Sequence, residues 1–306
     1  MEASITLKNI SKHYNKKYVL SNLTIGIEKG SNFAVIGRNG SGKSTLLRIL
    51  STLLKADNGI LYIGGKNISE HLAQVKKNVG YLPDYDIHDP WLTGLENLKR
   101  RARFMGMNDE KFDKIVIPLI KQFEMDDYVN NYPVTYSHGI KRRLDLIQVL
   151  MGDNAILILD EPLLGLDYFM RYKLIKYLLD FKKDKTIILA SNEFTEIQTI
   201  ADRWIVLHNG EIRFDGTLEK MTSQLELPFV ANLEIKNTEK IIETLKENKD
   251  VMEIRDFGNT IQVVTKDINI FNKIFKKIKS ENIVRVSGNS VNIEEFLNQL
   301  LSDEGF

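Results

Sequence analysis

The 306-residue sequence contains no cysteine. This absence excludes a disulfide framework, cysteine ligands for a metal and thiol chemistry, and it is typical of a reducing compartment such as the cytosol. The sequence also lacks any apolar run near the roughly 18 residues of a membrane span, and its start, MEASITLKNI, has no basic leader followed by an apolar core. We therefore expect a cytoplasmic chain whose link to any membrane is indirect.

An excess of charge of one sign is missing too, since 42 Lys and Arg stand against 41 Asp and Glu. No global field then attracts the chain to nucleic acid or to an anionic membrane surface. The five histidines are dispersed without the spacing of metal ligands, so we expect no structural metal. Partners must be inferred from individual sites.

Short apolar runs predict a core of β-strands. The runs at 5–10, 18–27 and 32–36 are rich in β-formers. Two later runs, 155–160 and 186–191, are continuously apolar, which is typical of strands buried on both faces in a parallel sheet. The pattern predicts an α/β core.

A mostly helical segment separates these strands at about 93–150, where apolar residues recur at helical spacing. The length of the chain favours two domains. We expect a first domain at 1–224 and a second at 225–306.

The second domain reads as βαββαβ, with helices at about 239–247 and 268–279 and a Gly258–Asn259 turn between two strands. An amphipathic helix is expected from Ile293 to the end. This pattern resembles a small α+β ferredoxin-like domain, and it contains no motif of a second active site.

The segment GRNGSGKST matches the phosphate-binding loop pattern and stands between a predicted strand and a predicted helix. Its glycines let backbone N–H groups point at phosphate oxygens, and the helix N-terminus favours anions. We expect Lys43 to reach the β- and γ-phosphates and Ser44 to ligate Mg²⁺. A chance glycine turn is the alternative. The expected nucleotide-binding residues are Gly37, Arg38, Asn39, Gly40, Ser41, Gly42, Lys43, Ser44 and Thr45.

The segment AILILDE places two acids at the end of a buried strand. Asp160 stands where a carboxylate completes the Mg²⁺ shell, and Glu161 where a carboxylate polarises the attacking water. A helix cap or a solvated loop is the alternative explanation for two acids at such a position.

These motifs stand in the order found in ABC transporter ATPase subunits, which the chain resembles over about residues 4–220. The resemblance implies a P-loop NTPase of the ABC type, with a mixed sheet core and a helical insertion, that binds ATP and Mg²⁺. Tyr14 stands where the family stacks an aromatic ring on adenine. An ordinary strand-end tyrosine is the alternative.

The segment YSHGIKRRL resembles the family signature, in which Ser137 and Gly139 match while His138 and Ile140 depart from it. The family uses this serine and backbone to bind the γ-phosphate of the opposite subunit, so the resemblance implies a head-to-tail homodimer or heterodimer. A plain helix cap is the alternative. Asp167 ends a D-loop-like LLGLD and is expected across that interface, or as a simple turn carboxylate.

Two further departures concern catalysis. Asp84 stands where the family has a glutamine or glutamate near Mg²⁺ and the attacking water, and Asn192 replaces the histidine that orients the γ-phosphate. Asparagine donates a hydrogen bond but carries no proton charge. We expect Asp84, Glu161 and Asn192 to form the catalytic set of a slow or partner-dependent ATPase.

The resemblance also implies separate transmembrane permease subunits, which dock in a groove beside residues 84–94. We place Trp91 in this groove as an interface anchor, with inward packing as the alternative. The second domain resembles the accessory domain of drug and peptide exporter ATPases, which favours export. Two other functions stay open: a degenerate ATP-binding partner of a heterodimer, and an ABC ATPase acting on ribosomes or DNA, which the missing basic stripe disfavours.

Overall fold

The chain divides into two compact units, residues 1–216 and 217–306, in a computed structural model. The expected boundary after residue 224 differs from this division by α8 (Leu218–Gln224), and the expected domain limits stay a prediction. The structure describes residues 3–15, 17–181, 185–192, 194–224, 229–235, 242, 245, 251–258, 260–265 and 283–289.

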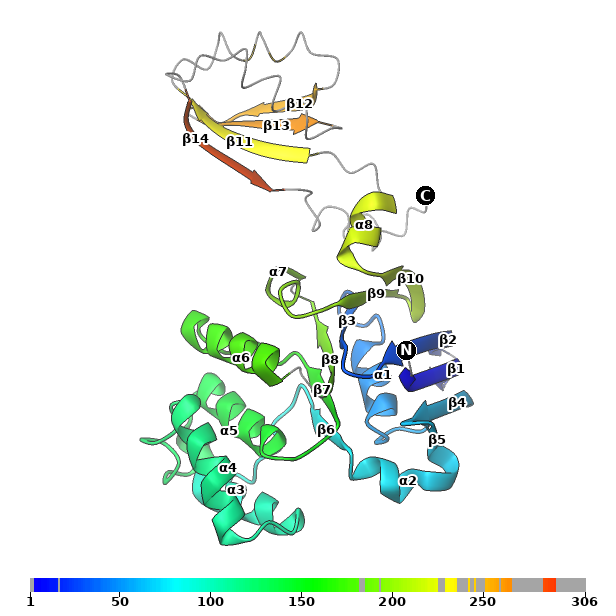
Figure 1. Cartoon of the computed structure of the whole chain (residues 1–306), viewed down its shortest axis with the longest axis vertical. Coiled ribbons are helices and arrows are strands. Elements are labelled where there is room, and N and C mark those ends of the chain that lie inside the picture. Colours follow the sequence, from blue (N-terminus) through cyan, green and yellow to red (C-terminus); the bar gives the residue numbers. More distant parts are fainter. Residues whose placement is uncertain are drawn as a thin grey trace. The chain divides into compact units, whose positions relative to one another are not determined.

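The first unit contains two β-sheets (Figure 1). Its strands are β1 (Ala3–Tyr14), β2 (Lys17–Glu28), β3 (Asn32–Ile36), β4 (Asn58–Ile63), β5 (Lys66–Asn67), β6 (Val79–Leu82), β7 (Ile156–Asp160), β8 (Thr186–Ser191), β9 (Arg203–His208) and β10 (Glu211–Gly216). One sheet is antiparallel with order β2-β1-β4-β5. The other has order β10-β9-β3-β8-β7-β6 and is parallel except for the β10-β9 pair. The expected mixed sheet core is confirmed.

The central strands of the second sheet are buried along their whole length, as their continuous apolar runs predict. Ile36 of β3 lies opposite Ser191 of β8, and Asp160 of β7 lies opposite Ala190. The carboxyl ends of these three strands therefore meet at one edge of the sheet. This edge, which we call the phosphate edge, brings together loops that are far apart in the sequence.

Helices cover the sheets, and those that lie between β6 and β7 form the expected helical insertion (Figure 1). They are α1 (Lys43–Leu50), α2 (Ile68–Lys76), α3 (Gly94–Phe104), α4 (Asp109–Gln122), the 3-10 turn η1 (Pro133–Thr135), α5 (His138–Leu150), α6 (Tyr168–Phe181) and α7 (Phe194–Ile197). Thr93 and Glu96 form a reciprocal capping box that fixes the start of α3, and Leu98 and Ala102 turn its apolar face inward.

The second unit contains α8 and an antiparallel sheet of order β12-β13-β11-β14. Its strands are β11 (Phe229–Ile235), β12 (Val251–Asp256), β13 (Thr260–Thr265) and β14 (Ile283–Asn289). The helices expected at 239–247 and 268–279 fall almost wholly outside the described residues, as does the tail from Ile293. The ferredoxin-like assignment therefore stays a prediction.

Candidate functional site

The loop after β3 has the geometry of a phosphate cradle. Gly42 has a φ of 108° and caps α1, and a Cβ there would lie 2.7 Å from the carbonyl oxygen of Val19. A Cβ at Gly37 would overlap the carbonyl oxygen of Leu207. Both positions require glycine, because neighbouring backbone leaves no room for a side chain. The free N–H groups at the start of α1 make this loop attractive to anions.

Lys43 holds a positive charge inside this loop. Its side chain is buried, and its Nζ donates to the carbonyl oxygen of Gly37 at 2.7 Å and lies 4.0 Å from Oε1 of Glu161. Burial lowers the pKa of Lys43, while the carboxylates of Glu161 and Asp160 oppose this change. The ammonium group thus faces two acids across the phosphate edge.

Asp160 is a buried carboxylate whose two oxygens make no well-formed hydrogen bond to a described residue. Burial raises its pKa, the nearby Ser44 hydroxyl lowers it, and Asp84 raises it again. Asp84 itself is partly exposed, with Oδ1 3.6 Å from the guanidinium of Arg48. A hydroxyl and two carboxylates converging here form an oxygen-rich donor set that suits Mg²⁺, which would satisfy the orphaned oxygens of Asp160.

Glu161 has a φ of 46°, an uncommon conformation for a residue with a side chain and one that concentrates at functional sites. Its N–H donates to the carbonyl oxygen of Ala190 at 2.9 Å, which fixes this backbone against β8. Burial raises the pKa of Glu161, opposed by Lys43, by the Ser191 hydroxyl and by the backbone N–H of Asn192. Asn192 thus lies beside Glu161, with its side chain exposed.

Arg142 on α5 is a residue that the sequence did not single out. Its guanidinium is buried and donates to the carbonyl oxygens of Pro83 at 2.6 Å, Asp160 at 2.5 Å and Glu161 at 2.9 Å. It therefore joins α5 to the ends of β6 and β7. In the sequence it stands in a basic run, and nothing there distinguishes it from the less deeply buried Lys141 and Arg143.

The signature-like segment packs on the D-loop-like segment. Ser137 caps α5 by accepting from the N–H of Ile140 at 3.4 Å. A Cβ on Gly139 would lie 2.7 Å from the carbonyl oxygen of Gly165, and a Cβ on Gly165 would overlap the His138 ring. The cap explanation is thus correct for the hydroxyl of Ser137, whose role toward a nucleotide stays a prediction.

Asp167 has local partners that match its turn explanation. It accepts from the N–H of Met170 at 2.9 Å and from Arg143 at 2.8 Å. The Met170 hydrogen bond, followed by the positive charge of Arg143, holds the pKa of Asp167 below its usual range. Its carboxylate is 58% exposed, so it also remains accessible to a second subunit.

Tyr14 ends β1 in a hairpin whose other strand touches the phosphate loop at Val19. Its ring is 48% exposed and lies under the Lys12 ammonium, which is 5.7 Å from the ring centroid. An exposed ring can receive an adenine, and this role of Tyr14 stays a prediction.

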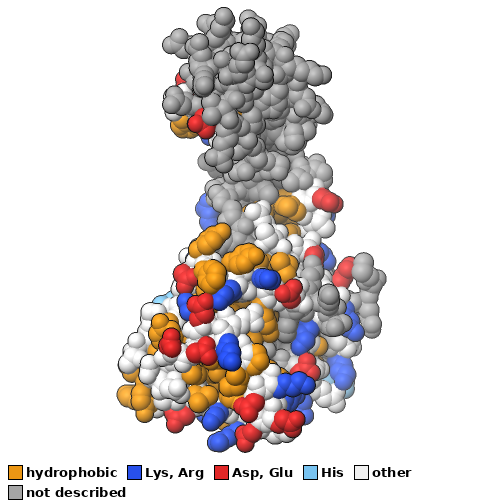
Figure 2. All heavy atoms as spheres, turned by 60° about the vertical axis from the view of Figure 1, so that its left-hand side comes forward, with side chains coloured by type: hydrophobic (Ala, Val, Ile, Leu, Met, Phe, Trp, Pro, Cys, Tyr) orange, Lys and Arg blue, Asp and Glu red, His pale blue; other side chains and the backbone are white. Residues whose placement is uncertain are grey.

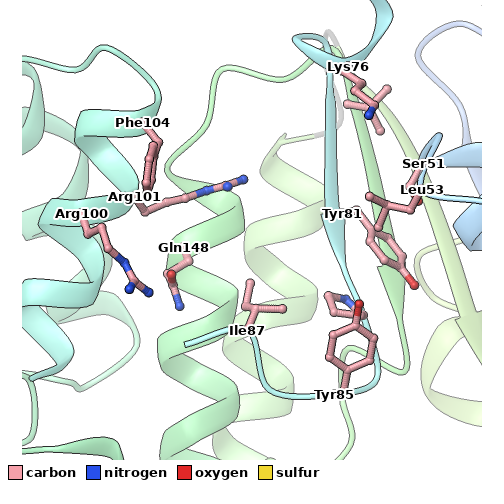
Figure 3. A pocket seen from close by; sticks show the side chains of 12 residues that line it. Ser51, Leu53, Lys76, Tyr81, Tyr85, Ile87, Arg100, Arg101, Phe104 and Gln148 are labelled. Carbon is pink, nitrogen blue, oxygen red and sulfur yellow. The ribbon is translucent and has the colours of Figure 1, made fainter. Parts of the chain in front are cut away.

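A pocket of about 400 Å³ lies between α3, β6 and the end of α1 (Figure 3). We call it the α3 groove, and it is lined by Ser51, Leu53, Lys76, Val79, Tyr81, Pro83, Tyr85, Ile87, Arg100, Arg101, Phe104 and Gln148. Trp91 is 82% exposed, which contradicts inward packing, and it does not line the α3 groove. Its role as an interface anchor stays a prediction. Phe104, 81% exposed, is an aromatic side chain that does line the groove. The helical face that bears α3 shows other hydrophobic side chains among charged ones (Figure 2).

The dispersed histidines include one that the fold places among acids. His88 is buried and bonded through Nδ1 to Oδ1 of Asp145 at 2.9 Å, with Asp86 3.6 Å from its Nε2. Asp145 also accepts from the N–H of Ile87 and from Gln148, and burial raises its pKa. The cluster fastens the segment after β6 to α5 beneath the α3 groove.

Among the described residues, no helix has both the length and the apolar character needed to cross a membrane.

Residues 20–164 match the family model for ABC transporters. The chain is 31% identical over 224 residues to the ABC transporter ATP-binding protein NatA of Bacillus subtilis, a match that covers 71% of this chain and 91% of that protein. It is also 31% identical over 254 residues to human ATP-binding cassette sub-family A member 10, covering 80% of this chain but 16% of that protein.

Solved structures agree with these relatives. An ATP-binding subunit of an ABC transporter superposes with a TM-score of 0.67 at 26% identity, covering 72% of this chain and 92% of that one. A dimeric ATP-binding cassette in a post-hydrolysis state, bound to ADP and Pi, gives a TM-score of 0.65 at 26% identity, covering 70% and 98%. The chain belongs to the ABC transporter family of ATP-binding proteins, and it is an ATPase.

Proposed function

We propose that this chain couples MgATP binding and hydrolysis to the movement of separate transmembrane subunits, and that it serves export. The observation that carries the proposal is the phosphate edge, where Lys43 faces Glu161 and the unpartnered carboxylate of Asp160. Export is supported by a relative, the Nod factor export ATP-binding protein I of Rhizobium etli, which is 31% identical over 72% of this chain and 71% of that protein. The chain then lies at the cytoplasmic face of the membrane through its partners.

Ser44, Asp160 and Asp84 are the residues proposed to hold Mg²⁺, which neutralises charge on the phosphates when it is bound. Asp160 offers two buried oxygens without a well-formed hydrogen bond to a described residue, and the Ser44 hydroxyl lies close enough to influence its pKa. Asp84 is the more exposed carboxylate and already has Arg48 near it. We therefore assign Asp160 and Ser44 to direct contact and Asp84 to contact through water.

Glu161 is proposed as the general base. Water attacks the γ-phosphorus, the bond from that phosphorus to the ADP oxygen breaks, and Glu161 accepts the proton of the water. Burial raises the pKa of Glu161, which makes its carboxylate a stronger base than an exposed glutamate. The ammonium of Lys43 is held in the phosphate loop, where its positive charge offsets the negative charge of the phosphates.

The catalytic unit is proposed to be a head-to-tail dimer of nucleotide-binding domains, in which Ser137 and Gly139 of one subunit meet the ATP of the other. Within one chain Gly139 lies close to the carbonyl oxygen of Gly165, and the His138 ring packs on Gly165. The relatives solved as dimeric cassettes support this arrangement. The second unit is proposed as an accessory module that supports the dimer.

The membrane subunit is proposed to dock a cytoplasmic helix in the α3 groove. The groove borders the segment after β6 that contains Pro83 and Tyr85, and Arg142 ties Pro83 to the backbone of Asp160 and Glu161. A movement in the groove would then reach the phosphate edge through one side chain.

Asn192 favours a second candidate, a degenerate partner that binds ATP in a heterodimer with little hydrolysis of its own. Asn192 lies beside Glu161 but cannot carry the positive charge of the histidine that the family places there. Under the main proposal, Asn192→His raises kcat by about tenfold or less, because one oriented donor is improved. If that substitution converts an inactive chain into an active one, the second candidate is correct.

The proposal is tested by steady-state MgATP hydrolysis of the purified chain beside Lys43→Ala and Glu161→Gln, with ATP binding measured in parallel. We expect turnover to be lost in both variants, while Glu161→Gln still binds ATP because its phosphate loop is intact. Turnover that survives in Glu161→Gln would remove Glu161 from the mechanism. Tight binding by the wild-type chain without turnover would support the second candidate.

A further inference from the structure

The α3 groove is an apolar pocket with cationic walls. Leu53, Tyr85 and Phe104 are exposed large apolar side chains on its rim, and they lie on three different segments of the chain. Its charged lining residues are Lys76, Arg100 and Arg101, and no aspartate or glutamate of the described part of the chain lines it. A pocket of this composition suits an occupant that is apolar and carries negative charge.

The two neighbouring arginines of α3 differ in what holds them. Arg100 donates to Oδ2 of Asp89 at 2.7 Å and to Oδ1 of Asn97 at 3.3 Å. Arg101 extends from α3 into the pocket (Figure 3), and its side chain has no hydrogen-bond or ion-pair partner among the described residues. Burial lowers the pKa of Arg101, and no nearby carboxylate opposes that change.

A half-buried guanidinium without a counter-charge costs stability, because its lost hydration is not replaced. A purely apolar helix would bind equally well to a groove lined by hydrophobic residues alone, without Arg101. The cation therefore indicates that the occupant brings the missing charge. Arginine is suited to this task, because its planar fork binds a carboxylate through two parallel hydrogen bonds.

We propose that the helix docked in the α3 groove presents a carboxylate among apolar residues, and that this carboxylate pairs with Arg101. The proposal rests on the proposed function, which supplies a membrane subunit as the source of the helix. Arg101 then selects the partner by charge, while Phe104 and Leu53 supply the apolar contact.

The test uses pairs of fluorescein-labelled amphipathic peptides of about 18 residues, long enough to form helix in solution. Each pair is identical except for Glu or Gln at the centre of the apolar face. Binding to the purified full chain is measured by fluorescence anisotropy. We expect the Glu peptide of a pair to bind about fivefold more tightly than its Gln twin, the gain of one partly buried ion pair.

Arg101→Gln is expected to abolish the preference for Glu and to leave the affinity for the Gln peptide unchanged. Lys99→Gln is the matched control, since Lys99 lies on the same helix, is exposed and does not line the groove. It removes the same charge and should keep the preference. Phe104→Ala should weaken both peptides equally, which locates the binding in the groove.

Equal affinity of the twin peptides for the wild-type chain would overturn the pairing with Arg101 and leave the groove as a docking site. A preference that survives in Arg101→Gln would do the same. Binding of neither peptide, or binding untouched by Phe104→Ala, would overturn docking in the groove altogether. MgATP hydrolysis by the wild-type chain, measured in parallel, reports separately on the activity of the phosphate edge.

Discussion

The phosphate edge and the α3 groove both hold buried or half-buried charges, but they balance them differently. At the phosphate edge Lys43 stands 4.0 Å from Glu161, so charges of opposite sign offset each other within one chain. In the groove Arg101 has no such partner among the described residues. The phosphate edge therefore suits a ligand that brings its own cation, such as MgATP, and the α3 groove suits a ligand that is itself an anion.

The two regions also differ in how their residues can be found, by a sequence motif at the phosphate edge and by packing alone in the α3 groove. The residues of the phosphate edge follow from the loop pattern and from two acids at a strand end. The residues of the groove come from the segments after α1 and β6 and from α2, β6, α3 and α5, and no sequence pattern joins them. Arg142 is the described side chain that links the two regions through Pro83 and Glu161.

The largest effect is expected from Asp160→Asn at the phosphate edge. This change removes a buried carboxylate proposed to hold Mg²⁺, so kcat should fall by about 10²- to 10³-fold. Steady-state hydrolysis at several Mg²⁺ concentrations measures it. Asp153→Asn is the control, because Asp153 is 86% exposed and pairs with Lys185. Equal rates in wild type and Asp160→Asn would show that this carboxylate is not needed.

Arg142→Met tests the link between the regions. It removes the buried donor of the Pro83 and Asp160 carbonyl oxygens and one of the two donors of the Glu161 carbonyl oxygen, so we expect the free energy of unfolding to fall by about 3 kcal/mol. Urea unfolding followed by circular dichroism measures the loss. Arg213→Met, at a partly exposed position that only approaches Glu211 at 3.9 Å, should change stability by less than about 0.5 kcal/mol. Similar values for both variants would contradict a bridging role.

Arg101→Met tests the groove, and here we expect the substitution to raise stability instead of lowering it. Because the guanidinium lacks a partner among the described residues, its replacement should raise stability by up to about 1 kcal/mol. A shift of the melting temperature by about 2–4 °C would report this gain. Lys99→Met on the same helix should leave the melting temperature unchanged. A fall in stability for Arg101→Met would mean that the guanidinium is already satisfied, and the contrast between the two regions would disappear.

Most of the first unit could be predicted from the sequence, because its signals are local. Continuous apolar runs indicated β7 and β8, and the pattern from Gly37 to Thr45 indicated the loop between β3 and α1. The fates of Trp91, Arg101 and Arg142 could not be predicted. Whether a bulky or basic side chain ends in solvent, in a groove or in the core depends on packing between distant segments.

The proposed dimer is the claim that connects the phosphate edge to function, and mixing two inactive chains tests it most directly. Lys43→Ala disables the phosphate loop. Ser137→Asp keeps a good helix cap but sets a negative charge where the partner's ATP is expected. A head-to-tail dimer of one chain of each kind contains one intact site, so the mixture should hydrolyse MgATP although neither variant does alone. A mixture no more active than the separate variants would contradict the shared site.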